Sequence, residues 1–111
     1  AYLFTNIRIF NTYYEIVYHS LGEMKTVKEI ENYDWPNVDW WDYDAIPELI
    51  KKEKQNDDVC IMFFAGGTFE SPWYMRGLEQ FLIDIYDEPE IAENISRKVG
   101  EFYYERAMRF L

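Results

Sequence analysis

The residues best suited to chemistry lie in and just after a glycine loop that reads AGGTFESP over residues 65–72. The glycine pair would let a ligand approach the backbone closely, because glycine has no Cβ. The loop acid supplies a carboxylate, and the tyrosine that follows supplies a phenol, which can donate a hydrogen bond to a carboxylate or an amide. The candidate substrate-binding residues are therefore Tyr74, Gly66, Gly67 and Glu70.

Each of these residues also has a purely structural interpretation. The glycine pair would suit any tight turn, and Tyr74 would suit ordinary aromatic packing. Glu70 could pair with Arg76 instead of with a ligand, as a solvated ion pair worth at most about 1 kcal/mol. The loop is not a phosphate-binding loop, because no lysine follows the glycines and the G-x-G-x-x-G spacing is absent.

The other reactive side chains point to structure rather than to catalysis. His19 is the only histidine and Cys60 the only cysteine, and without ligand spacing they do not form a zinc site. A catalytic thiol would need exposure, but Cys60 lies within an apolar run. The acids among residues 34–44 indicate caps and turns rather than a metal cage. We therefore assign no metal site and no catalytic residue to this chain.

The first half of the chain contains a hairpin pattern and two helix patterns. Alternating β-branched and aromatic residues over Asn6–Ser20, with Asn11 and Thr12 between two runs, predict a β-hairpin. The stretch 26–33 opens with a capping box, in which Thr26 and Glu29 bond reciprocally. A second helix is predicted to begin at an N-cap, Asp44, and to run to about residue 55.

The second half predicts one strand followed by helices. Val59–Phe64 is a continuous apolar run, which is typical of a strand covered on both faces, as in a parallel sheet. A helix is predicted over 73–86, with Leu78, Leu82 and Ile85 on one side. Pro89 would begin another helix, whose apolar stripe consists of Ile91, Ile95, Val99 and Phe102.

This α-β-α order predicts an α/β fold, but only a part of one. A strand buried on both faces needs parallel neighbours, and 111 residues are too few for a (β/α)8 barrel, which needs about 250. We expect a fragment of such a TIM barrel, with an N-terminal β-hairpin, one buried strand and several helices. Residues 1–111 would then form a single partial domain, and the start without Met suggests an excised or trimmed piece.

Charge and composition limit the partners. The formal net charge is -10, which argues against nucleic acid and anionic membrane surfaces as partners. No apolar run approaches the roughly 20 residues that span a bilayer. The single cysteine favours a reduced, cytoplasmic setting. Because the edges and faces of Val59–Phe64 would lack cover in an isolated piece, we expect self-association.

The order of motifs resembles the uroporphyrinogen decarboxylase-like superfamily, especially its branch related to corrinoid methyltransferases. The segment HSLGEMKTVKEIENYDWPN is similar to that branch's His-Pro-Leu, Thr-x-x-Asp/Glu helix start and Tyr-x-Trp-Pro. Later, FESPWYMRG and DEPE are similar to its Phe-Glu, Tyr-x-Arg-Gly and Asp-x-Pro-Glu motifs. The resemblance covers most of the chain from His19 onward. Ser20 departs from the usual proline.

The resemblance implies an internal segment of a barrel enzyme that contributes one wall of the active site to a small-molecule substrate. It places Tyr74 on the family's substrate-contacting tyrosine, whereas residues 67–69 depart from the Ala-Pro-Trp of the decarboxylases. It also implies that the zinc ligands and the catalytic aspartate lie outside this chain, which therefore holds no cofactor, and that a corrinoid partner serves the complete methyltransferase.

These expectations leave three functions open. The first is a segment of an enzyme for corrinoid-linked methyl transfer, and the second is a segment of uroporphyrinogen III decarboxylase itself in porphyrin biosynthesis. The departure at residues 67–69 and the Tyr-x-Arg-Gly pattern favour the first. The third, from another class, is a non-catalytic interaction domain. In each enzymatic case we expect the isolated chain to be inactive.

Overall fold

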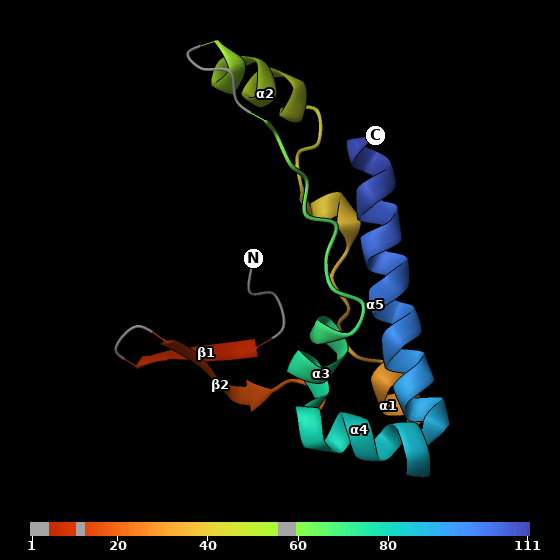
Figure 1. Ribbon diagram of the computed structural model, residues 1–111. Helices are drawn as coiled ribbons and strands as arrows, with labels where there is room; N and C mark the ends of the chain where they lie inside the picture. Colours follow the sequence, from red (N-terminus) through yellow and green to blue (C-terminus); the bar gives the residue numbers. More distant parts are fainter. Residues whose placement is uncertain (1–4, 11–12, 56–59) are drawn as a thin grey trace.

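The described part of the chain begins with a two-stranded antiparallel sheet (Figure 1). The computed structural model describes residues 5–10, 13–55 and 60–111. Strand β1 (Thr5–Phe10) pairs with strand β2 (Tyr13–His19), from Thr5 opposite His19 to Phe10 opposite Tyr13, with a register shift between Asn6 and Ile7. The predicted hairpin is therefore confirmed, and its predicted turn residues, 11 and 12, lie outside the described residues.

Helix α1 (Val27–Glu31) begins with the predicted capping box. Thr26 Oγ1 accepts a bond from the Glu29 backbone N–H at 3.2 Å. Glu29 Oε2 accepts bonds from the backbone N–H groups of Lys25 at 2.8 Å and Thr26 at 2.9 Å. These bonds stabilise the carboxylate, so the pKa of Glu29 is lowered, chiefly by the Lys25 N–H and then by the side chain and N–H of Thr26. The capping box is confirmed.

Helix α2 (Ile46–Lys54) forms close to the predicted range, but its predicted cap is wrong. Ala45 occupies the N-cap position and has no side chain to cap the helix. Asp42 Oδ1, two residues before the predicted Asp44 cap, instead accepts the Ala45 backbone N–H at 3.3 Å. In Figure 1 this helix lies at the opposite end of the molecule from α1, α3 and α4.

The predicted helix over 73–86 is in fact two helices. Helix α3 (Glu70–Arg76) and helix α4 (Leu78–Asp87) are separated by Gly77. Gly77 has φ +92°, a conformation that side-chain-bearing residues rarely adopt, so it ends one helix and redirects the chain into the next. Helix α5 (Pro89–Phe110) then begins at Pro89, as predicted.

The hydrophobic core sits where α5 meets α1 and α3. The predicted stripe of α5 is confirmed, since Ile91, Ile95, Val99 and Phe102 are all buried. In Figure 1, α1, α3 and α4 gather at the lower end of this long helix. The buried residues that form the contiguous core are Leu21, Ile30, Met75, Ile91, Ile95 and Val99.

Helix α4 buries a different face from its apolar stripe. Leu78, Leu82 and Ile85 are 44%, 51% and 50% exposed. The buried positions are instead Phe81 and a charged residue, Asp84. A surface helix normally turns its apolar stripe inward. Here a carboxylate is buried instead, and a buried charge is unfavourable unless it has a charged or hydrogen-bonding partner.

The predicted fragment of a (β/α)8 TIM barrel is wrong. Cys60–Phe64, the described part of the predicted buried strand, has no regular secondary structure, and Met62 and Phe64 are 87% and 78% exposed. A strand needs a partner for its backbone groups, but β1 and β2 pair with each other. The segment instead lies along α5, where the Phe63 ring stacks on Phe110 with centroids 3.9 Å apart.

The chain is mainly helical and elongated. Its radius of gyration is 16.8 Å, against about 13 Å for a compact domain of roughly 100 residues. The only sheet in the described residues is the hairpin, so the architecture is helical with a β-hairpin rather than α/β. Within the described residues, no helix has the length and apolar character needed to cross a membrane.

Candidate functional site

The glycine loop packs tightly against α5 and against the start of α3. Gly66 has φ +128°, and a Cβ at this position would overlap the ring of Tyr103 on α5. A Cβ on Gly67 would overlap the carboxylate of Glu70. The Tyr103 ring and the positive φ therefore require glycine at position 66, whereas at position 67 the exposed Glu70 side chain could move aside. Of the candidate residues, the structure brings Gly67 and Glu70 into contact.

A pair of hydroxyl groups and an arginine hold the loop on α5. Ser71 Oγ and Tyr103 Oη lie 2.6 Å apart and share one hydrogen bond. Arg106 Nη2 donates to the Phe64 carbonyl oxygen at 2.8 Å. Its guanidinium carbon lies 5.4 Å from the ring centroid of Phe63 and 5.6 Å from that of Tyr103. These contacts hold the loop against α5 up to the point where α3 begins.

Tyr74 lies in the second turn of α3 and is 40% exposed. It follows Glu70 by four residues, so the two side chains lie on the same face of the helix. Its ring lies against Trp73, with centroids 4.1 Å apart. Its backbone carbonyl accepts a hydrogen bond of 2.7 Å from His19 Nδ1. Glu70 and Tyr74 are thus both open to solvent on α3.

Arg76, at the end of the same helix, is buried and does not pair with Glu70 as proposed from the sequence. Its Nε donates to Asp84 Oδ2 at 2.6 Å, and its Nη2 donates to Asp84 Oδ1 at 3.3 Å. Arg76 is 3% exposed and Asp84 fully buried, so this is an ion pair inside the protein. Gln80 Nε2 also donates to Asp84 Oδ1, at 2.7 Å.

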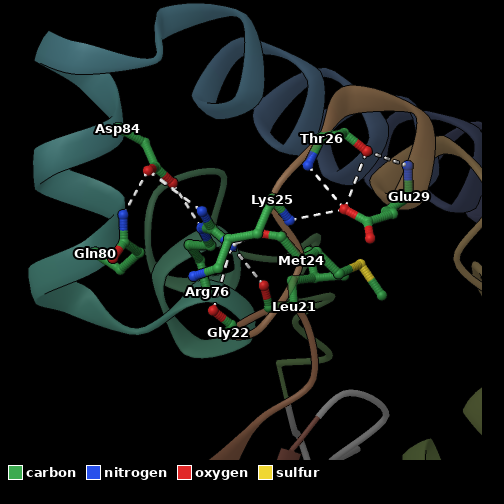
Figure 2. A network of polar contacts seen from close by, with 9 residues as sticks. All are labelled: Leu21, Gly22, Met24, Lys25, Thr26, Glu29, Arg76, Gln80 and Asp84. Atoms are coloured by element: carbon green, nitrogen blue, oxygen red, sulfur yellow. Dashed lines mark hydrogen bonds and ion pairs between the residues drawn. The ribbon is translucent and has the colours of Figure 1, made fainter.

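The same guanidinium bonds to the turn that follows β2 (Figure 2). Arg76 Nη1 donates to the carbonyl oxygens of Leu21 and Met24, both at 2.6 Å. Leu21 N–H in turn donates to the Met75 carbonyl at 2.8 Å. The side chain of Arg76 therefore joins α3, α4 and the 21–24 turn, and its donors are engaged by protein groups rather than offered to a ligand.

The described residues show no arrangement suited to a metal. They contain no group of three or more His, Cys, Asp or Glu side chains able to hold a metal ion. Cys60 is exposed, although its apolar neighbours predicted burial. His19 is half-buried and is engaged with Tyr74 through Nδ1.

Sequence reasoning missed three contacts at this site: Arg76 with Asp84, His19 with Tyr74, and Ser71 with Tyr103. The first runs against the sequence pattern, because the apolar spacing of α4 predicted that Leu78, Leu82 and Ile85 face inward rather than Asp84. The other two join residues 55 and 32 positions apart in the chain, and no local pattern indicates them.

No protein-family model matches this chain, and no curated protein or solved structure is significantly similar to it. Sequence motifs and site geometry therefore carry the functional proposal.

The contact between Gly66 and Tyr103 predicts unequal responses to two glycine substitutions. Gly66→Ala forces a side chain into the Tyr103 ring at a positive φ, and we expect it to lower the free energy of unfolding by about 1–3 kcal/mol. Gly100→Ala in α5 meets nothing within 4 Å, and a helical alanine should raise the free energy by about 0.5–1 kcal/mol. Denaturant unfolding of both variants measures these changes. A Gly66→Ala protein as stable as the wild type would contradict the described packing.

Proposed function

We propose that this chain is a segment of a uroporphyrinogen decarboxylase-like enzyme, in the branch related to corrinoid methyltransferases. Its part in that enzyme is to present Tyr74, Glu70 and the Gly66-Gly67 loop as one wall of the substrate site. The proposal rests on the ordered motifs from His19 onward. The proposal does not require the described residues to form part of a barrel.

One observation carries the proposal. Two motif segments that lie far apart in sequence, HSLGEM and WYMRG, are joined by hydrogen bonds to backbone carbonyl oxygens. His19 of HSLGEM bonds to Tyr74 of WYMRG, and the carbonyls of Leu21 and Met24 bond to Arg76. A chance likeness dispersed over some 60 residues would not require its matching positions to form one bonded group. This convergence supports the resemblance.

The chemistry available at this wall is binding and orientation. A tyrosine hydroxyl donates a hydrogen bond to a carboxylate or carbonyl oxygen, and two side-chain torsions make it inexpensive to hold in place. Glu70, also exposed, can accept a hydrogen bond from a donor group of the substrate. The proposed role of Tyr74 is to fix the substrate through one such bond, while bond making and breaking take place on groups outside this chain.

Methyl transfer is the preferred reaction class because residues 67–69, Gly-Thr-Phe, replace the decarboxylases' Ala-Pro-Trp. Zinc would activate the accepting thiol in that branch. The described residues do not fit zinc, since they contain no group of three metal-ligating side chains. Zinc and a corrinoid partner protein are therefore assigned to the complete enzyme. Decarboxylation of a porphyrinogen in porphyrin biosynthesis is the alternative.

A second function, association through an apolar surface, is favoured by the exposure of large side chains. Met62, Phe64 and Tyr86 are 87%, 78% and 88% exposed, and the Leu78, Leu82 and Ile85 stripe of α4 is about half exposed. Apolar groups exposed in such number usually mark interaction surfaces. For the isolated chain we propose self-association.

The exposed thiol of Cys60 suits a reducing, cytoplasmic location.

Tyr74→Phe in the complete enzyme tests the proposed function. Two reactions are measured: methyl transfer from methylcobalamin to a thiol, and release of CO₂ from uroporphyrinogen. We expect the wild-type enzyme to catalyse methyl transfer. In the Tyr74→Phe variant, kcat/KM for this reaction should fall about tenfold or more, because a hydrogen bond to a charged group contributes about 1.5–3 kcal/mol. Stability should change by less than about 1 kcal/mol, since only one hydroxyl is lost.

Tyr86→Phe is the matched control, because Tyr86 is 88% exposed and lies on α4. It should leave both kcat/KM and stability unchanged. Turnover of neither substrate would contradict the proposed family function. A loss of stability in Tyr74→Phe with unchanged kinetics would remove Tyr74 from the site.

The exposed apolar residues predict that the isolated chain forms dimers or larger assemblies. Burial of apolar surface contributes roughly 25 cal/mol per Å². Sedimentation velocity over a range of concentrations measures the assembly, and Met62→Ser combined with Phe64→Ser should shift it toward monomer. A strictly monomeric wild-type chain at high concentration would show that these side chains do not drive association.

A further inference from the structure

We propose that Arg76 is a positioning residue that sets the placement of Tyr74, with His19 as the connecting group. This inference deepens the proposed function and rests on it for the role of Tyr74. Arg76 itself would not touch the substrate. Figure 2 shows its guanidinium bonded to the 21–24 turn and to Asp84 of α4.

The charge of Arg76 is already neutralised within the protein. Asp84 accepts from Nε and Nη2, and the carbonyls of Leu21 and Met24 accept from Nη1. With 3% exposure, the guanidinium offers no surface on which a ligand anion could bind. An arginine buried in this way contributes through the geometry that it imposes.

That geometry reaches Tyr74 by two routes. Along α3, Arg76 follows Tyr74 by two residues, so fixing Arg76 fixes the last turn of a seven-residue helix. Through space, Arg76 holds the turn that begins at Leu21, and His19 lies two residues before that turn. Nδ1 of His19 then bonds to the Tyr74 carbonyl at 2.7 Å. The backbone of Tyr74 is thus held from both sides.

The His19 contact provides a direct report on this arrangement. A backbone carbonyl only accepts hydrogen bonds, so Nδ1 carries the proton and the neutral ring is held in the Nδ1–H tautomer. The ring also lies against Gly77, where a Cβ would be 3.4 Å from His19 Cδ2. If the 21–24 turn moved away from α3, this bond would lengthen and the tautomer preference would be lost.

Lysine cannot replace Arg76 in this role. A guanidinium presents five N–H donors in a planar fork, whereas an ammonium presents three donors from a single atom. Asp84 and the two carbonyls are bonded by three different nitrogens of Arg76, and one lysine nitrogen cannot reach all of them. Arg76→Lys therefore keeps the positive charge but cannot keep all of the hydrogen bonds that join Asp84 to the 21–24 turn.

The test compares Arg76→Lys with Val99→Ala in the 111-residue chain. Val99 is 3% exposed in the core on α5 and makes none of the hydrogen bonds of Arg76, so its truncation lowers stability while keeping every donor and acceptor of those bonds. NMR on ¹⁵N-histidine and ring-¹³C-tyrosine protein reports the His19 tautomer and the Tyr74 ring signals, at a pH where imidazoles are neutral. The Tyr74 signals are assigned with Tyr74→Phe.

We expect Arg76→Lys to abolish the single Nδ1–H tautomer of His19 and to shift the Tyr74 ring signals. Val99→Ala should leave both at wild-type values. If Arg76→Lys does not fold, Asp84→Asn provides the same readout, since it removes the carboxylate charge but keeps the shape, and a smaller shift in the same direction is expected. Wild-type signals in the folded Arg76→Lys or Asp84→Asn variant would overturn the proposal, and so would equal changes in Val99→Ala.

These readouts need no substrate. If the complete enzyme turned over neither test substrate, the proposed function would fail while the dependence of Tyr74 on Arg76 could still be measured. If the NMR signals did not respond to Arg76, the positioning role would fail while the kinetic test of Tyr74 stayed valid.

Discussion

The structure depends on one buried ion pair, Arg76 with Asp84. Both groups are withdrawn from water, which is unfavourable unless the charges and the remaining donors find partners. They find them in Gln80 and in the carbonyls of the 21–24 turn. Removing one member of such a pair typically costs about 3–5 kcal/mol, because the other charge stays buried without a partner. The turn, α3 and α4 therefore have little freedom to rearrange independently.

This constraint explains why α4 turns Asp84 inward and leaves an apolar stripe outside. The inward face is set by the partner that Arg76 needs, and the break at Gly77 lets α4 turn back so that Asp84 reaches the end of α3. The outward stripe of α4 is the consequence, and it adds to the exposed side chains of Met62 and Phe64. A helical chain with a small core at one end of α5 thereby presents surfaces suited to association.

Local patterns predicted the elements that local interactions determine. The capping box at Thr26, the pairing of the hairpin strands and the stripe from Ile91 to Phe102 each depend on residues close in sequence, and each is confirmed. The strand predicted at Val59–Phe64, and the TIM barrel inferred from it, failed because a strand exists only with a pairing partner, which composition cannot supply. At the site, the Gly67–Glu70 contact is local, whereas the bonds of Arg76 and Tyr74 to residues 19–24 are not.

Native-state hydrogen exchange of the Leu21 amide tests the central claim most directly. This amide donates to the Met75 carbonyl at 2.8 Å, in the turn that Arg76 holds. If the buried pair makes the turn part of the cooperative core, Leu21 should exchange with the same free energy of opening as the amide of Ile95 in α5, equal to that of global unfolding. A much smaller free energy for Leu21 than for Ile95 would show that the turn opens alone, and would contradict the account.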